Sequence, residues 1–388
     1  MTDIPDATLR GRSHWDIVRE QFGKNGSAMF GLSLVCGLFV ITVLVPFLAN
    51  GKPLYITENG QTRFPLLRTL SRSDLIVIAA AACYLSALIA RKITQCRRRW
   101  PWPTAAALFV GLTVLIIATI RPINDRIDYR SIAAQGGVTA LFAPIRYSPE
   151  ETDLFKKRQP PFKLPGHWLG TDDLGRDVFS RLLWSTRVSL AVGFVAQGLA
   201  VTIGVILGAI AGYFGKKTDF AIMRLVEVMM CFPSFFLILT ILAFFGRNLW
   251  LIMAVIGLVG WTENARFVRA EFLKLRTMDY AIAARALGLG WKRTIFRHLL
   301  PNGLAPVMVN ASFGIAAAIL VEGGLSFLGF GVPPPTATWG TMLNDGKINP
   351  MAMPWMILLP GFAIFLAVAG YNLVGEGLRD ALDPKLRR

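Results

Sequence analysis

The chain has 388 residues, of which 54% are hydrophobic and only 17% are charged. A soluble chain has roughly 25% charged residues, so this composition argues against a soluble protein. Continuous apolar runs of about 16–25 residues indicate a membrane protein with several spanning helices, and they lack the period-two alternation of a membrane β-barrel. The formal net charge of +17 fits the Lys and Arg excess in the cytoplasmic loops of such proteins, so no nucleic-acid partner is expected.

The N-terminal third predicts three spanning helices. Residues 1–27 are polar, and the apolar run 28–49 is long enough to cross a bilayer at 1.5 Å per residue. Two shorter runs, about 75–90 and 103–120, predict an extra transmembrane hairpin over residues 75–120. Residues 91–99 between them carry five basic residues and no acid, which places this loop, and hence the N-terminus, in the cytoplasm.

The rest of the chain predicts a long outer segment followed by five spans. Residues 121–180 are polar with nearly matched charges, and counting spans places them in the periplasm. The residues after the last span, 377–388, form a cytoplasmic tail. The fold class is thus all-α, a polytopic helical membrane protein of about eight transmembrane helices. The five later spans cover residues 187–212, 220–245, 249–270, 303–326 and 355–376.

Residues 279–300, a cytoplasmic segment between two spans, form the most informative part of the sequence. Asp279 is the expected N-cap of a short helix, and Gly288 suits the C′ position, where a left-handed conformation ends a helix. A second short helix over 291–299 is expected to stop near Pro301. Composition leaves two alternatives, a docking surface for a partner protein or an amphipathic helix on lipid headgroups. Small residues leave room for a partner's groove, namely Ala281, Ala283, Ala284 and Ala286.

This segment resembles the signature of ABC importer permeases: E-A-A, three residues, Gly, nine residues, Ile-x-Leu-Pro. Ile282 stands where the family has Glu, and His298 where it has Ile. The matching positions are Ala283, Ala284, Gly288, Leu300 and Pro301. The resemblance implies a coupling segment that docks on an ATPase subunit. It assigns the contact to Asp279, Tyr280, Ala283, Ala284, Leu287, Gly288, Leu300 and Pro301.

Other motifs extend the resemblance over roughly residues 165–385. They are similar to the dipeptide and oligopeptide branch of binding-protein-dependent ABC permeases, which implies a type I importer permease core with a transmembrane domain over residues 187–376. These motifs include G-T-D-x-x-G-R-D at 170–177, A-G-Y-F-G at 211–215, C-F-P-S at 231–234 and L-S-F-L-G-F-G at 325–331. Shorter pieces resemble the Yej-type peptide and microcin C permeases, their E subunit, and lie at 51–54, 64–67 and 141–147.

The same resemblance implies a set of partners. They are a second homologous permease subunit, ATP-binding subunits, a periplasmic peptide-binding protein and the lipid bilayer of the bacterial inner membrane. The implied cargo is an oligopeptide or a peptide-like antibiotic such as microcin C. No cofactor is expected on this chain, since ATP–Mg would bind the partner ATPases. In agreement, the fragment 215–218 has Lys217 where a P-loop needs Ser or Thr.

Two other function classes remain as alternatives. An ion-coupled secondary transporter would carry ionisable residues in mid-span, whereas Glu227, Glu263 and Glu322 lie nearer to span ends. A membrane enzyme is disfavoured because the three histidines are scattered and neither H-E-x-x-H nor G-x-S-x-G occurs. No catalytic or metal site is therefore predicted, and the four cysteines show no C-x-x-C spacing.

Overall fold

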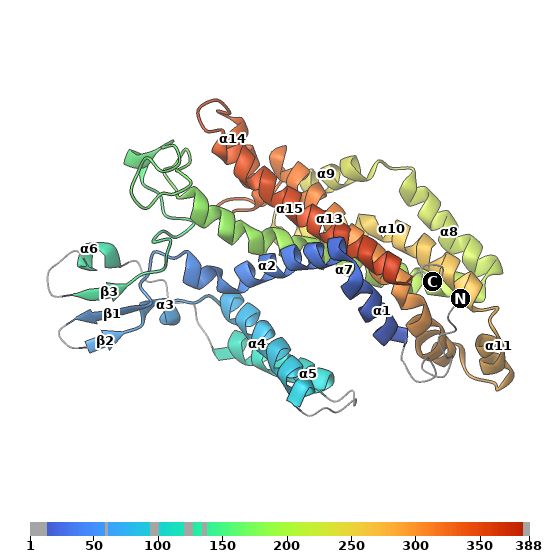
Figure 1. Cartoon of the computed structure of the whole chain (residues 1–388). Helices are drawn as coiled ribbons and strands as arrows, with labels where there is room; N and C mark the ends of the chain where they lie inside the picture. The colour runs from blue at the N-terminus through green and yellow to red at the C-terminus, as the bar shows by residue number, and fades with distance from the viewer. Residues whose placement is uncertain (1–13, 59–60, 94–100, 120–126, 134–137, 383–388) are drawn as a thin grey trace, which may run out of the picture. The chain divides into compact units, whose positions relative to one another are not determined.

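The structure, a computed structural model, describes residues 14–58, 61–93, 101–119, 127–133 and 138–382 (Figure 1). The chain divides into two compact units. Unit 1 comprises Met1–Gly37, Val188–Ile348 and Ile357–Arg388, and unit 2 comprises Leu38–Arg187 and Asn349–Met356. Two helices, α2 (Gly26–Leu48) and α7 (Val178–Phe214), contribute residues to both units.

Unit 1 is helical throughout its described residues, and unit 2 adds three short strands. The other elements of unit 1 are α1 (His14–Lys24), α8 (Lys216–Met230), α9 (Ser234–Phe245), α10 (Leu249–Leu275), α11 (Asp279–Ala286), α12 (Trp291–Arg293), the π-helix η3 (Thr294–Leu299), α13 (Leu300–Phe327), α14 (Trp339–Lys347) and most of α15 (Trp355–Leu382). Those of unit 2 are β1 (Tyr55–Glu58), β2 (Gln61–Arg63), α3 (Pro65–Arg68), α4 (Arg72–Ile93), α5 (Pro101–Thr119), α6 (Tyr129–Ala133), β3 (Thr139–Leu141) and the 3₁₀ turn η2 (Leu154–Lys156).

The helical membrane-protein fold is confirmed. Six helices of the described residues are long and apolar enough to span a membrane, and the count is seven if the bent pair α8–α9 is one span. The predicted span 103–120 corresponds to α5, whose described apolar part, Thr104–Thr119, is shorter. A count of eight spans therefore stays a prediction. The basic loop used to assign the cytoplasmic side falls largely outside the described residues.

The predicted span 220–245 corresponds to two helices, α8 and α9, separated by a sharp bend. Between Met230 and Ser234 the chain bends by 77°, which separates α8 from α9. Pro233 causes the break, because proline lacks the N–H that would continue the helix and its ring disfavours helical geometry in the residue before it. The C-F-P-S sequence noted above thus marks a broken helix.

Helices α7 and α10 touch through their backbones. Gly204, Gly208 and Gly212 repeat every four residues and share one face of α7. A Cβ atom built on Gly208 would lie 2.5 Å from the Ala265 carbonyl oxygen, and one on Gly212 would lie 2.5 Å from the Phe272 Cβ. Glycine repeats of this kind let membrane helices approach closely, because packing and not hydrophobicity drives association in lipid. The pair α7–α10 is therefore the rigid frame of unit 1.

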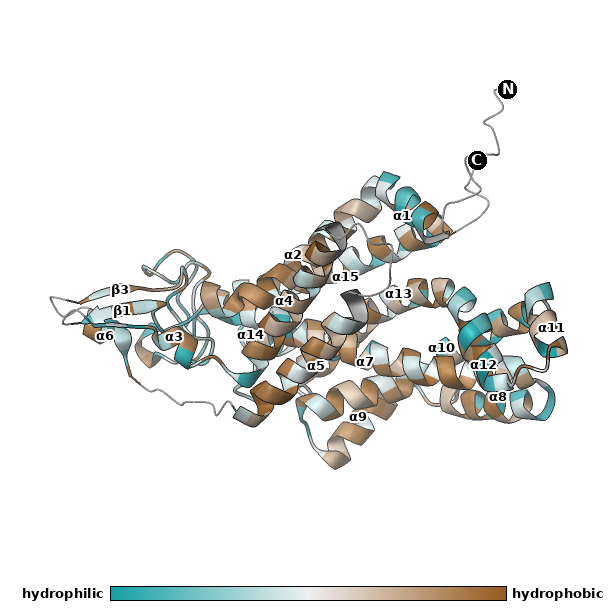
Figure 2. Cartoon of the chain, turned by 90° about the horizontal axis from the view of Figure 1, so that it is seen from below, coloured by the Kyte–Doolittle hydropathy of each residue, from teal (hydrophilic) through white to brown (hydrophobic). Residues whose placement is uncertain are grey.

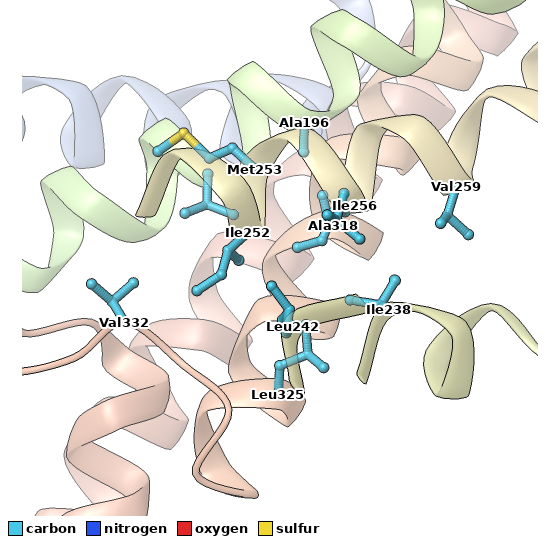
Figure 3. Close-up of a cluster of buried hydrophobic side chains, with 12 residues drawn as sticks. Ala196, Ile238, Leu242, Ile252, Met253, Ile256, Val259, Ala318, Leu325 and Val332 are labelled. Carbon is cyan, nitrogen blue, oxygen red and sulfur yellow. The ribbon is translucent and has the colours of Figure 1, made fainter. Parts of the chain in front are cut away.

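A buried apolar cluster joins α7, α9, α10 and α13 (Figure 3). Figure 3 shows Leu242 of α9 and Leu325 of α13 pointing toward each other, below Ile252 and Ile256 of α10. Ala196 of α7 completes the contact. Cores of this density resist changes in side-chain volume, so the cluster fixes α9 despite the break before it.

Helix α14 follows Pro335 and is not among the helices expected from the sequence. Thr338 begins it with a capping box, in which the Thr338 hydroxyl accepts from the Thr341 N–H and the Thr341 hydroxyl from the Thr338 N–H. Trp339 is fully buried, and its backbone N–H donates to the Ser189 hydroxyl of α7 (3.2 Å). The capping box here uses Thr at N3 where Glu or Gln is usual, which hides it from pattern reading.

In unit 2 a small sheet accompanies the extra hairpin, so the all-α prediction holds except for these strands. The strand order is β2-β1-β3, and both pairings are antiparallel. Helices α4 and α5 pack against each other. Asp74, in the first turn of α4, accepts from the Ser71 N–H (2.7 Å) and from the Arg187 guanidinium. This buried ion pair attaches the hairpin to the start of α7 within unit 2.

Candidate functional site

The predicted coupling segment consists of α11, a tight turn, α12 and η3. Helix α11 begins at Asp279, but its N-cap is Met278, which makes no side-chain capping bond. The predicted N-cap role of Asp279 is therefore wrong. Asp279 occupies the first turn instead, where its negative charge stabilises the helix through the positive end of the helix dipole.

The end of α11 is a Schellman motif centred on Gly288. The Leu289 N–H donates to the Ala284 carbonyl (3.2 Å), and the Gly288 N–H donates to the Arg285 carbonyl (3.0 Å). Gly288 has φ +69°, the left-handed conformation that glycine adopts without strain. The predicted C′ role of Gly288 is confirmed. The turn fixes the direction in which the chain leaves α11 toward Trp291.

The small residues of α11 do not share one face. Ala281 is 1% exposed and Ala284 is 4% exposed, whereas Ala283 and Ala286 are exposed. Ala281 packs into a buried cluster with Phe272 of α10 and Leu299 of η3. Ala284 is therefore buried within this chain, and its assignment to the ATPase contact stays a prediction. Its small side chain lets α11 pack closely against η3.

The exposed residues of α11 and its C-cap include apolar ones. Leu287, the C-cap, is 79% exposed, Ile282 is 49% exposed and Tyr280 is 39% exposed. Burial of the phenol raises the pKa of Tyr280, and a hydrogen bond with Asn302 opposes that shift, so the hydroxyl stays protonated at neutral pH. Ile282, at the position where the signature has Glu, is thus an exposed hydrophobic residue.

The segment after the turn continues into α13 rather than stopping. Helix α12 leads into η3 and then directly into α13, in which Pro301 occupies the first turn. The prediction that a helix ends near Pro301 is wrong. The wide π-turn supplies the room that the proline ring needs over the preceding turn, and a first-turn proline loses no essential N–H bond. Leu300 is half-buried, and Pro301 is exposed.

Hydrogen bonds connect this segment to the rigid α7–α10 frame. The Arg285 guanidinium donates to the Arg276 carbonyl at the end of α10 (2.7 Å). Arg276 in turn donates to the Gly212 carbonyl of α7 (3.1 Å). The Trp291 ring meets the Phe214 ring edge-on, with 5.6 Å between centroids. Figure 2 shows hydrophilic residues gathered on α8, α11 and α12, at one end of the apolar helices. A force on α11 is thus transmitted to α7 and α10.

The G-T-D-x-x-G-R-D motif forms a second organised region, in unit 2. Asp172 is buried and accepts four hydrogen bonds, from the Leu174 and Arg176 N–H groups (2.9 Å each), the Arg176 side chain (2.7 Å) and Arg181 (2.5 Å). Asp177 caps α7 through the Ser180 N–H (2.7 Å). Gly175 has φ +74°, and a Cβ there would lie 1.8 Å from the Asp153 carbonyl oxygen. These contacts fix the turn before α7.

Asp172→Asn is expected to loosen this region. The change removes the charge that balances Arg181, which is 3% exposed, and breaking a buried ion pair costs about 3–5 kcal/mol. Trypsin should then cleave the purified protein after Lys156 or Lys157 at least several-fold faster. Asp173→Asn is the matched control, because Asp173 pairs with the exposed Arg158. Equal cleavage of the two variants would contradict the structural role of Asp172.

The three glutamates considered for an ion-coupled transporter are either hydrogen-bonded within the chain or exposed at its surface. Glu322 is buried and accepts from the Ser326 hydroxyl (2.6 Å) and the Thr338 hydroxyl (2.8 Å), so it ties α13 to the start of α14. Glu227 and Glu263 are exposed. Among the described residues no group of His, Cys, Asp and Glu has metal-binding geometry. Ser326 and Thr338, which donate to Glu322, give no periodic signal in the sequence that would identify them as its partners.

Comparisons with known proteins agree with this geometry. Residues 204–388 match the family described as the binding-protein-dependent transport system inner membrane component. A dipeptide transport system permease protein, DppC, of Alkalihalophilus pseudofirmus is 42% identical over 252 residues, which are 64% of this chain and 82% of that protein. An oligopeptide transport system permease protein, OppC, of Bacillus subtilis is 39% identical over 251 residues, again 64% and 82% of the two chains.

A chain of an inward-facing MetNI methionine ABC transporter is a structural neighbour, with a TM-score of 0.41 and 19% identity over 51% of this chain and 96% of that chain. The sequence relatives alone establish the relationship, because this chain covers about four-fifths of each at roughly 40% identity. The chain belongs to the family of binding-protein-dependent transport system inner membrane components.

Proposed function

We propose that this chain is a permease subunit of an ATP-driven peptide importer, and that α11, α12 and η3 form its docking site for an ATPase subunit. One observation supports this most strongly. Helix α11 exposes Ile282, and its C-cap residue Leu287 is 79% exposed, while Ala281 is buried in a cluster with Phe272 of α10 and Ala209 of α7. Exposed apolar side chains on a rigid support suit a protein partner that moves the frame.

The orientation of the chain in the membrane follows from the proposed ATPase docking site. ATPase subunits act in the cytoplasm, so α11 and the ends of α7 and α10 next to it lie on the cytoplasmic side. Asn25, just before α2, donates to Asp380 near the end of α15 (3.2 Å), so these two parts of unit 1 share one side. Both termini are then cytoplasmic, and the membrane is the bacterial inner membrane. The periplasmic location of residues 121–180 stays a prediction from the sequence.

The cargo and the remaining partners are inferred from the relatives. Two of the relatives carry dipeptide and oligopeptide transport in their names, so peptides are the proposed cargo. A second, related permease subunit would complete the pathway, and a periplasmic binding protein would deliver the peptide. ATP–Mg would bind the ATPases and not this chain. The Yej-type subtype and microcin C stay predictions.

Leu287→Asp tests the docking site. A charge at the most exposed apolar position of α11 is expected to prevent ATPase association, because the partner would have to bury an unpaired carboxylate. Purification in mild detergent should recover the ATPase subunit with the wild-type chain and lose most of it with the variant. Phe155→Asp is the control, since Phe155 is 99% exposed and lies in unit 2.

Full recovery of the ATPase with Leu287→Asp would contradict the docking site. The ion-coupled alternative predicts a different outcome for the wild type. The purified chain alone, in liposomes with an ion gradient but no ATPase subunit, would then accumulate peptide. The proposed function predicts no accumulation under those conditions.

A further inference from the structure

Helices α8 and α10 carry exposed ionisable residues within membrane-spanning segments. Arg224 and Glu227 lie on α8, which forms a span together with α9, and Glu263 and Arg266 lie on α10. A charged side chain facing lipid costs at least about 2.5–3.5 kcal/mol, so such residues nearly always face water or protein. These four side chains therefore favour contact of this side of unit 1 with water or protein over contact with lipid tails.

A cavity of about 620 Å³ opens between these two helices. Its volume falls within the range of small-molecule binding sites. The lining residues that matter for recognition are Met223, Glu227, Met230, Cys231, Arg266 and Arg269. The cavity lies at the break between α8 and α9, and interrupted helices of this kind commonly form substrate sites in transporters.

The charges in the cavity are of two kinds. Arg269 makes a two-bond ion pair with Asp219, so its charge is already balanced within the helix pair. Arg266 instead donates to the Met230 sulfur (3.5 Å) and meets no carboxylate among the described residues. Glu227 pairs with Arg224 at the surface (2.6 Å), where both side chains are more than half exposed. An exposed pair is weak, so both Arg266 and Glu227 can bind a ligand's charges.

The rest of the lining suits a ligand of variable shape. Met223 and Met230 are flexible and polarisable, and methionine is common at surfaces that accept many partners. Cys231 adds a small sulfur group at the break. A cavity with one anionic group, one cationic group and adaptable apolar walls fits a molecule that carries both charges and variable side chains. A short peptide with a free amino and a free carboxyl end has these properties.

We propose that the α8–α10 cavity is a peptide-binding site on the translocation pathway, in which Glu227 binds the ligand's ammonium group and Arg266 its carboxylate. This proposal rests on the proposed function and adds the residues that contact the cargo. The alternative is that charged residues of a second permease subunit cover the same surface. The experiments below separate the two.

The native cysteine in the cavity provides the first test. In the assembled complex, with Cys36, Cys83 and Cys96 replaced by alanine, a charged, membrane-impermeant methanethiosulfonate reagent should modify Cys231. Saturating zwitterionic tripeptide should slow this reaction about tenfold, as expected when a ligand occupies the site almost fully. A variant that retains only Cys36, which is exposed on α2, should show no peptide effect.

Two results of this labelling test overturn the site. One is reaction with the charged reagent at a rate that peptide does not change. The other is a Cys231 that reacts in the isolated chain but not in the assembled complex, which would show that a partner subunit covers the cavity. Failure of the charged reagent to react at all, when a lipid-soluble maleimide does, would likewise contradict a water-filled cavity.

Transport kinetics provide the second test. Glu227→Gln and Arg266→Gln are each expected to raise the KM for tripeptide uptake about tenfold, the loss of one charged contact, with kcat changed less than twofold. Arg19→Gln, an exposed residue of α1, is the charge-matched control. A purely structural role would instead lower the amount of assembled complex and leave KM unchanged.

The outcomes also separate this site from the proposed function. If the wild-type complex imports no peptide, the proposed function fails. If the wild type imports peptide and recovers its ATPase, but both variants keep the wild-type KM and peptide does not protect Cys231, the site assignment alone fails. An acetylated and amidated tripeptide lacks both terminal charges. It should bind the wild type about as weakly as the zwitterionic tripeptide binds a variant with both Glu227→Gln and Arg266→Gln.

Discussion

Gly288→Pro is expected to abolish peptide uptake while the chain still inserts into the membrane. Proline fixes φ near −65°, whereas Gly288 has φ +69° and donates its N–H to the Arg285 carbonyl. Leu287 before it has φ −75° and ψ 6°, a helical conformation that a following proline disfavours. The combined cost is about 3 kcal/mol or more. The turn between α11 and α12 cannot form, so the docking surface loses its shape.

A graded series at the same position separates conformation from bulk. A Cβ at Gly288 meets no atom within 4 Å, so alanine adds only the left-handed strain of about 1–2 kcal/mol. Asparagine tolerates this conformation and should keep most of the uptake. The expected order of uptake in proteoliposomes is Gly, Asn, Ala and then Pro. Gly290→Ala is the control, since Gly290 has φ −59° and open space around it. Normal uptake by Gly288→Pro would contradict the coupling assignment.

Gly208→Leu is expected to prevent assembly of a folded chain. A Cβ at this position would lie 2.5 Å from the Ala265 carbonyl oxygen and 3.1 Å from the Arg269 nitrogen. Both are backbone atoms of α10, so no side chain can move aside and the two helices must separate. Overpacking typically costs about 1–3 kcal/mol and occasionally more. Separating the two helices would also break the close contacts that Gly204 and Gly212 make with α10 on the same face, which adds to the cost.

Size-exclusion profiles and the melting temperature in detergent would measure this effect. Gly208→Leu should give aggregated protein or a melting temperature lowered by several degrees. Gly198→Leu lies on the same helix with no atom within 4 Å of its Cβ and should behave like the wild type. Equal profiles for the two variants would contradict direct contact between α7 and α10.

The helical membrane fold could be predicted from the sequence, because hydrophobicity and length largely determine which segments span a bilayer. Gly288 was readable for a similar reason, since a local rule links a glycine after an Ala-rich helix to a left-handed end. The glycine repeat at Gly204, Gly208 and Gly212 is equally visible in the sequence and is a known packing pattern in membranes. The sequence analysis did not use it.

The features that sequence could not supply depend on tertiary packing. Which alanines of α11 point inward depends on how the helix rests on Phe272 and Leu299, and the sequence offers alanine on both sides. Pro301 stays inside a continuous helical path because η3 adopts a π-turn, which has no sequence signal of its own. The burial of Trp339 and Glu322 likewise depends on contacts between segments far apart in the chain.

The central claim is that the exposed side of α11 contacts an ATPase subunit. A photo-crosslinking amino acid at position 287, which is 79% exposed, tests it directly in the assembled complex. The same group at position 284, which is 4% exposed, is the internal comparison. The account predicts an adduct with the ATPase subunit from position 287 and none from position 284. Adducts of position 287 with lipid alone would contradict it.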